Sequence, residues 1–565
     1  MPADPRRAAA SVATAVLALL LVTTSSVTAV APDLSEESTA TFTLLPDEGR
    51  VAVENRITIR HRKQPTTRMD PCEDDPEKFC EVDVNYFWSA WGPIQVPATA
   101  SNVEISVADG GAQMIEQDED WVSYVVTFPE LHYRQNRKVK ISYDLPGAGP
   151  RSGLGTRVTD AYARFCWHGE PADGGSVTAI LPAGYQDRTF GGRVKAKRSA
   201  RKSTLKGTVK GDPAAFYACT DAFQPDQLAR VYVLGPSEQV ITVDNWPEDP
   251  EWRDSLLDVV GVDLAELERL IGSPMRFDEL TVLEVARTSP FGSSDDFDPA
   301  RAQLRIGDDL DTPGVATTAL ARTWFNEDTI ADPWLREGLA LWSGLTAAGA
   351  ACPVLDTLPD QGVPDLTDWP RGLERPGSDA ARMLEHQRAV ACSIVADTAG
   401  IIGPEAMASV VASLVADTSA YGSQPAVPAS DPAPADWHDW LDAVDELGLM
   451  PAGGTDLEVA ERTLLEHGIA SAGDLATRAS ARAIYHEALD TMNGTAMPAY
   501  VNDLMADWSF SDALPAVVEA GRAYRTITEA TALTEVQRTE FLDAFESVAS
   551  SDGLARLEQA VSDAS

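Results

Sequence analysis

The segment VATTALARTWFNEDTIADPWLREGLALWSG, residues 315–344, is the most informative part of the 565-residue chain. Apolar residues recur at helical spacing in its first half, and a second stripe of the same kind runs through its second half. Asp332 is placed to cap the second helix, and Pro333 is placed in its first turn. We therefore predict two helices joined by a short loop. The residues between the stripes that could carry chemistry are Thr318, Ala319, Arg322 and Glu337.

Composition limits the classes of partner. The chain carries 87 acidic and 45 basic side chains, which gives a formal net charge of −42. Nucleic acids and anionic membranes carry phosphate groups that repel such a surface, so we exclude both as main partners. We interpret the excess as a surface charge that keeps a secreted or salt-exposed protein dispersed in water.

Residues 1–29 have the pattern of a secretory signal peptide. Arg6 and Arg7 form a basic start, and a largely apolar run of eleven residues, Val12–Val22, follows. The run is too short to span a bilayer, and Ala29 ends a stretch of small residues suited to cleavage. We expect a secreted, extracytoplasmic protein. The alternative is an uncleaved N-terminal segment, which would be its only contact with a membrane.

The six cysteines are typical of an oxidising compartment. Six cysteines allow 15 connectivities, so the sequence leaves the pairing open. No Cys-x-x-Cys pair occurs, which disfavours a zinc–cysteine site. Grouping the cysteines by expected domain suggests the pairs Cys72–Cys80, Cys166–Cys219 and Cys352–Cys392.

Residues 36–243 are predicted to form a β-sandwich. Short alternating or β-branched runs, such as Thr41–Leu45 and Val139–Tyr143, are separated by turn residues. Residues 70–78 are predicted to form an acidic loop closed by a disulfide. Eight basic residues between Arg193 and Lys210 alternate with small or apolar ones, which predicts a hairpin. We favour a solvated face for these charges, and the alternative is a patch for an acidic partner.

Residues 244–422 are predicted to form a mixed α+β domain. Apolar residues recur at helical spacing from Trp252 to Ile271, and strand patterns follow near Leu280 and Ala302. A Pro/Ala/Ser-rich linker covers 423–435, and the apolar patterns in 436–565 are all helical. The predicted fold class is multidomain, with a β-sandwich, an α+β domain and an all-α domain in chain order.

Two parts of the 315–344 segment resemble the aminopeptidase N type of metallopeptidases, which belong to the gluzincins. Thr318-Ala-Leu-Ala-Arg-Thr-Trp-Phe is similar to their His-Glu-Leu-Ala-His-Gln-Trp-Phe helix, and Trp334-Leu-Arg-Glu-Gly-Leu-Ala is similar to their Trp-Leu-Asn-Glu-Gly-Phe-Ala segment. The resemblance implies a saddle-type N-terminal β-sandwich, a thermolysin-like middle domain and a helical C-terminal region. The specific match covers about thirty residues, because Trp-Phe and Glu-Gly-x-Ala occur together and in order.

In that family, two histidines one turn apart bind zinc, the Glu between them is the general base, and a Glu on the second helix is the third ligand. The first histidine falls on Thr318, the base on Ala319 and the second histidine on Arg322, so only Glu337 remains as a metal ligand. Ala319 cannot accept a proton, and the fixed charge of Arg322 repels a metal ion. The resemblance therefore implies a degenerate site with no metal and no other cofactor. Zinc is expected only if unusual ligands hold it.

Two further elements of the family have no counterpart. We find no Gly-x-Met-Glu-Asn segment in residues 275–311, and no tyrosine stands where a transition-state tyrosine is expected. His386 stands roughly at that tyrosine's place. We name His386 and Trp324 as candidate binding residues.

A replacement for the metal can be predicted from charge. Arg322 and Glu337 would face each other where zinc otherwise bridges the two helices, so we predict a guanidinium–carboxylate pair between them. The alternative is that Arg322 extends its charged end into solvent.

Other possible sites are weaker. The helix motif His486–Asp490 superficially resembles a zinc helix, but we interpret it as a surface helix. The acidic clusters 295–298 and 308–311 lack the Gly and distal Glu of a calcium loop, so we interpret both as solvated loops.

These observations support three functional hypotheses. The first is a secreted, catalytically inactive relative of zinc aminopeptidases, a pseudoenzyme whose scaffold binds peptides or extracellular proteins. The second is an active metallo-aminopeptidase with atypical ligands. The third is a structural cell-surface interaction protein whose former cleft has no role.

Overall fold

The computed structural model describes residues 33–72, 75–118, 121–150, 155–169, 174–209, 216–286, 296–354, 366–369, 379–416, 418–422, 433–449 and 458–565. The predicted signal peptide and most of the predicted linker lie outside these ranges. Across the helices described, none combines the length and apolar character needed to cross a membrane. The architecture is β-rich at the N-terminus, mixed in the middle and all-helical at the C-terminus, as predicted.

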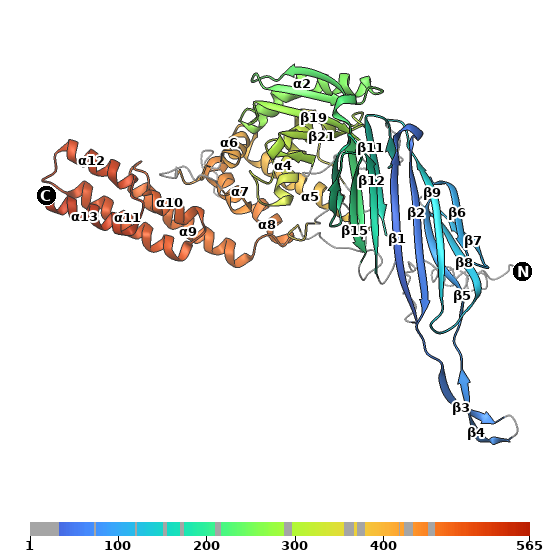
Figure 1. The fold of residues 1–565 in the computed structure, drawn as a ribbon. Helices are drawn as coiled ribbons and strands as arrows, with labels where there is room; N and C mark the ends of the chain where they lie inside the picture. Colours follow the sequence, from blue (N-terminus) through green and yellow to red (C-terminus); the bar gives the residue numbers. More distant parts are fainter. Residues whose placement is uncertain are drawn as a thin grey trace, which may run out of the picture. The chain divides into compact units, whose positions relative to one another are not determined.

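A seven-stranded sheet dominates the N-terminal region (Figure 1). Its inner face is largely apolar, because buried residues such as Phe42 and Leu44 alternate with half-buried threonines along the strand. The first strand pairs in parallel with β12, and the other pairs in this sheet are antiparallel. In spatial order the strands are β14 (Lys195–Arg198), β15 (Lys202–Val209), β12 (Gly174–Pro182), β1 (Leu34–Leu45), β2 (Arg50–His61), β9 (Asn136–Pro146) and β6 (Ser101–Val107).

Three smaller sheets complete this region. One has the order β5 (Trp88–Pro97), β8 (Trp121–Leu131), β7 (Gly111–Gln117), and another has the order β10 (Arg157–Val158), β11 (Tyr162–His168), β16 (Tyr217–Phe223), β13 (Gln186–Gly191). The third consists of β3 (Thr66–Cys72) and β4 (Asp75–Val84), which form a hairpin that projects beyond the end of β2 (Figure 1). The predicted acidic loop is therefore largely paired strand, and β14 and β15 form the predicted basic hairpin.

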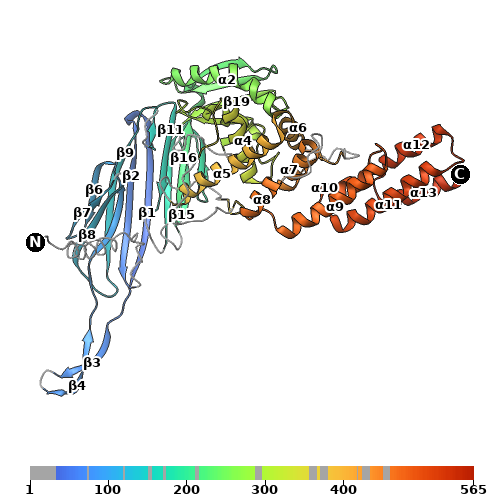
Figure 2. The same ribbon diagram turned by 180° about the vertical axis from the view of Figure 1, so that it is seen from behind.

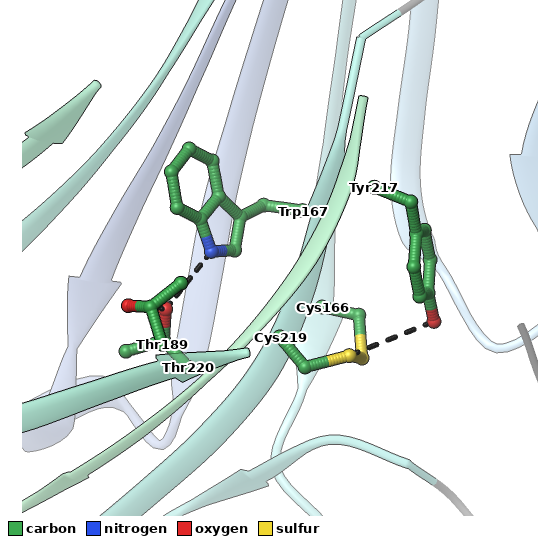
Figure 3. Close-up of a disulfide and its surroundings, with 6 residues drawn as sticks. All are labelled: Cys166, Trp167, Thr189, Tyr217, Cys219 and Thr220. Carbon is green, nitrogen blue, oxygen red and sulfur yellow. Dashed lines mark hydrogen bonds between the residues drawn. A yellow bond between two sulfur atoms is a disulfide. The ribbon is translucent and has the colours of Figure 1, made fainter. Parts of the chain in front are cut away.

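The three predicted disulfides are present: Cys72–Cys80, Cys166–Cys219 and Cys352–Cys392. The Cys166–Cys219 bridge joins β11 to β16, and the Tyr217 hydroxyl lies 3.6 Å from Cys219 Sγ (Figure 3). The neighbouring Trp167 donates its indole N–H to Thr220 Oγ1 at 2.9 Å, so the two strands are also joined on their other face. Disulfides of this number indicate an oxidising compartment.

The middle region contains a five-stranded sheet with the order β17 (Ala229–Leu234), β18 (Val240–Asn245), β19 (Glu279–Val285), β21 (Gln303–Gly307), β20 (Phe297–Asp298). Its three central strands are parallel and its two edge pairs are antiparallel. The predicted helix 252–271 is α2 (Pro250–Ile271), which begins at the capping residue Asp249 and ends at Gly272. Gly272 has a φ of 74°, the left-handed conformation that commonly ends a helix.

The helices that follow share one core with this sheet. They are α3 (Val315–Ala321), α4 (Pro333–Ala347), α5 (Asp379–Ile402) and α6 (Pro404–Val415). Both views place α4 and α5 side by side (Figures 1 and 2). Almost every residue of α4 from Trp334 to Leu345 is buried, as expected of a helix in the centre of a domain.

The C-terminal region is helical, and α9 (Ala472–Thr491), α11 (Phe510–Glu529), α12 (Glu535–Glu546) and α13 (Ser551–Ala564) form its elongated bundle (Figure 2). Ser550 caps the last helix, α13, and its hydroxyl accepts the Gly553 backbone N–H. A short helix, α10 (Ala499–Ala506), lies between α9 and α11 in the sequence.

The hydrophobic core does not divide at the predicted linker. Trp440 and Leu441 of α7 (Trp437–Ala443) belong to the same core as the five-stranded sheet, and so does Leu464 of α8 (Glu458–Glu466). Ala435, at the end of the linker, forms an isolated parallel bridge with Ile330. The first helices after the linker therefore complete the middle core, and the separate C-terminal core begins with α9.

Candidate functional site

The two predicted helices of the 315–344 segment pack at unusually short range. A Cβ atom added to Gly344 of α4 would lie 2.3 Å from Thr318 Cα and 2.5 Å from Thr318 Oγ1 of α3. Real side chains do not tolerate such distances, so only glycine allows this approach. Thr318 is consequently fully buried against α4.

The next helix makes a similar contact. A Cβ atom added to Gly338 would lie 2.7 Å from the carbonyl oxygen of Ala391 in α5. Cys392, beside Ala391, forms the disulfide with Cys352, which follows α4. The three helices α3, α4 and α5 are therefore held together by two glycine contacts and one covalent bond.

Arg322 and Glu337 form the predicted ion pair between α3 and α4. Arg322 Nη2 donates to Glu337 Oε2 at 3.0 Å. Both side chains are 1 % exposed, so the alternative in which Arg322 reaches solvent is wrong. Pairing offsets part of the cost of burying each charge.

A second guanidinium, which the sequence patterns did not single out, approaches the same oxygen. Arg388 Nε, on α5, lies 3.7 Å from Glu337 Oε2, within ion-pair distance but too far for a hydrogen bond. The Arg388 side chain is 11 % exposed. Glu337 therefore lies between two positive charges.

Several donors and acceptors around this pair have no hydrogen-bond partner among the described residues. They are Thr318 Oγ1, Arg322 Nε and Nη1, Arg388 Nε, and His386 Nδ1. His386 is half-buried and lies on α5, two residues from Arg388. The structure thus brings Arg322 and Arg388 to one carboxylate, that of Glu337, while Thr318 packs against Gly344.

These residues do not fit zinc. Arg322 stands at the position where the resemblance places a second histidine, and its guanidinium binds the carboxylate of Glu337 directly. Ala319 offers no basic atom, and Thr318 offers one hydroxyl. In the part of the chain that the structure describes, no group of three or more His, Cys, Asp or Glu side chains is arranged to hold a metal ion.

Comparisons with known proteins give a distant structural likeness. No protein-family profile matches the sequence, and no curated protein matches it. Among solved structures, an M1 zinc metallopeptidase from Deinococcus radiodurans is similar over 77 % of this chain and 93 % of its own length, with 14 % identity and a TM-score of 0.31. A two-domain M1 zinc metallopeptidase variant bound to L-arginine covers 77 % of this chain and 94 % of its own, with 15 % identity and a TM-score of 0.30.

Trp324 is a core residue, so its assignment as a binding residue is wrong. Its side chain is fully buried, and its indole N–H donates to the carbonyl oxygens of Ser273 at 3.2 Å and Pro274 at 3.0 Å. These bonds join the segment after α3 to the end of α2 and leave no free face for a ligand.

Asp332 stands at the predicted N-cap position of α4, but its side chain does not cap that helix. Its Oδ2 instead accepts the backbone N–H of Trp437, the first residue of α7, at 2.8 Å. Burial raises the pKa of Asp332. The Asp332 side chain thus joins the start of α4 to the start of α7, two helices that are distant in sequence.

The His486 motif is also structural. His486 Nε2 lies 3.0 Å from Glu446 Oε1, and the neighbouring Arg482 binds the same carboxylate at 2.8 Å. One turn earlier, the fully buried Arg478 binds Asp442 at 2.7 Å and Asp445 at 2.6 Å. These ion pairs and hydrogen bonds hold α9 against α7 and the π-helix η6 (Val444–Leu449).

A buried acidic cluster lies near the carboxyl ends of the parallel strands. Glu284, near the end of β19, is fully buried and accepts the Trp246 backbone N–H at 2.7 Å. Burial raises the pKa of Glu284 to about 10, against the effect of this hydrogen bond, and the nearby Asp249 and Asp308 raise it further. Glu284 is therefore protonated at neutral pH.

The acidic loops are only partly solvated, which corrects the prediction for them. Asp296 is 1 % exposed and Asp308 is 2 % exposed. Asp298 binds Arg301 at 2.7 Å, and Asp309 accepts the backbone N–H of Asp311 at 3.1 Å. The loops bury individual carboxylates because the adjacent strand ends are themselves in the core.

Proposed function

We propose that the protein is a secreted, catalytically inactive scaffold of the aminopeptidase N type, in which an internal ion pair replaces the metal. The observation that carries this proposal is the buried hydrogen bond from Arg322 to Glu337. The only retained ligand position is engaged by a permanent cation, so a divalent metal there would have to displace a charge of its own sign.

The contacts around the ion pair support a scaffold that keeps its helix packing and lacks the catalytic side chains. The glycine contacts of α4 and the disulfide to α5 hold the helices on both sides of the pair. The substitutions at Thr318, Ala319 and Arg322 remove both zinc ligands and the general base together. Such a scaffold retains the means to bind peptides or extracellular proteins without cleaving them.

The experiment is a metal and activity measurement on the purified chain. After dialysis, we expect far less than one zinc per chain, and no chelator-sensitive release of an aminoacyl chromophore. Stoichiometric zinc together with chelator-sensitive cleavage would establish the active-peptidase alternative and contradict this proposal. A peptide-library binding screen then separates a peptide-binding scaffold from a purely structural one.

A further inference from the structure

The cluster that replaces the metal ligands has a net positive charge. Arg322 and Arg388 approach one oxygen of a single carboxylate, Glu337, at 3.0 and 3.7 Å. Two guanidiniums remain charged at any relevant pH, so within the described part of the chain the one carboxylate paired with them leaves one positive charge uncompensated. A cationic site in a chain of net charge −42 is a local reversal of its overall charge.

The same cluster contains hydrogen-bond donors without acceptors. Arg322 is 1 % exposed, yet its Nε and Nη1 donate to no acceptor among the described residues. Arg388 Nε, at the same carboxylate, also lacks a hydrogen-bond partner among the described residues. Buried charged donors are normally satisfied, so such a set indicates an absent acceptor.

We propose that this cluster is a binding site for a small oxyanion, a carboxylate or phosphate group, held by Arg322 and Arg388. Guanidinium groups match the geometry of both oxyanions and bind them with charge-assisted hydrogen bonds. The anion would supply the missing acceptors and the missing negative charge. The Arg388 side chain is 11 % exposed and forms the partly exposed side of the site, from which the anion would enter.

This inference rests on the proposed function only in requiring that no metal occupies the site. It adds the chemical class of the ligand. A peptide could present such a group as its C-terminal carboxylate, and a phosphorylated ligand could present it as a phosphate ester.

The test is calorimetric titration of the full chain with inorganic phosphate, with acetate, and with one short peptide prepared with a free or an amidated C-terminus. We expect millimolar or tighter binding of at least one oxyanion. Binding of acetate and the free-acid peptide, with loss on amidation, identifies the carboxylate source. Binding of phosphate alone identifies the phosphate source.

The variant R388Q removes one charge at the partly exposed side and should weaken binding by about tenfold or more. R382Q, an exposed arginine on the same helix, is the matched control and should change binding by less than about twofold. Circular dichroism of R388Q checks that it folds. Absence of binding by the wild type, or equal binding by R388Q, would overturn the proposal. Zinc content is measured separately. Stoichiometric zinc would contradict the proposed function, whatever the result of the binding titration.

Discussion

Arg322 Nη2 and Glu337 Oε2 lie 3.0 Å apart, and each side chain is 1 % exposed. The two residues are fifteen positions apart on separate helices, at positions where the resemblance to metallopeptidases places a zinc ligand on each helix. A permanent cation thus neutralises the buried carboxylate of Glu337. A guanidinium has no open coordination position and cannot activate water as a bound zinc ion can.

Removing either partner of this pair should destabilise the fold, and the two losses in unfolding free energy should differ. R322M leaves Glu337 with Arg388 still nearby, so we expect a loss of about 3 kcal/mol in the free energy of unfolding. E337Q leaves the buried Arg322 and the partly exposed Arg388 without a carboxylate and should cost more. The double variant R322M/E337L should recover much of the loss, because the one charge that remains, that of Arg388, is partly exposed.

Urea denaturation measures all of these variants. R269M, which removes an exposed pair with Glu266, is the control and should leave the unfolding free energy nearly unchanged. Equal effects of R322M and R269M would contradict the assignment of Arg322 to a buried pair.

Gly344 should be intolerant of any side chain. Its added Cβ would lie 2.3 Å from the Cα and 2.5 Å from the backbone N of Thr318, and these atoms cannot rotate away. We expect G344A to lose about 1–3 kcal/mol of stability, measured by thermal or urea unfolding. G400A in α5, where no atom lies within 4 Å of the added Cβ, should instead be neutral or gain up to about 1 kcal/mol. A stable G344A would show that α3 and α4 pack less closely than described.

Glu284 should make stability fall as pH rises. Its pKa in the folded state is about 10, above the ordinary value of 4.5, so the folded state holds a proton that the unfolded state releases. Its contribution is fully present below the unfolded pKa and is lost as pH approaches the folded pKa. The slope from this group is about 1.4 kcal/mol per pH unit within that window.

The variant E284Q keeps the shape of the protonated acid and removes this proton linkage. It should be more stable than the wild type by about 3 kcal/mol near pH 7, with a difference that grows at higher pH. Urea unfolding at several pH values measures it, and E279Q, an exposed residue of the same strand, is the control. Parallel pH profiles for wild type and E284Q would refute the proton assignment.

Arg478 should control the attachment of α9. Its guanidinium is fully buried between Asp442 and Asp445, so R478M leaves two buried carboxylates with reduced compensation. We expect a loss of about 3–5 kcal/mol, together with faster amide hydrogen exchange in α9 and η6. R522M on α11, which removes an exposed pair with Glu558, should leave exchange in α9 unchanged. Uniform exchange changes across all helices would argue against a local role.

The sequence patterns predicted helices and strands best where the apolar periodicity extends over a long segment. The spacing of α2 and α4 and the alternation of β1 and β9 depend on local geometry that each segment expresses by itself. The patterns failed where an aromatic side chain packs into the core, as Trp324 does. Whether an apolar or aromatic residue faces a ligand or another helix depends on neighbours that are remote in sequence.

The 315–344 segment shows the same division. The sequence alone determined that Arg322 carries a fixed positive charge, that Ala319 has no basic atom and that a buried Glu337 needs a positive partner, because these follow from residue chemistry. Only the tertiary structure decided that Arg388 approaches the same carboxylate and that Gly344 admits Thr318 at contact distance. Charge compensation and steric fit are sums over contacts between distant parts of the chain, so they exist only once α3, α4 and α5 have come together.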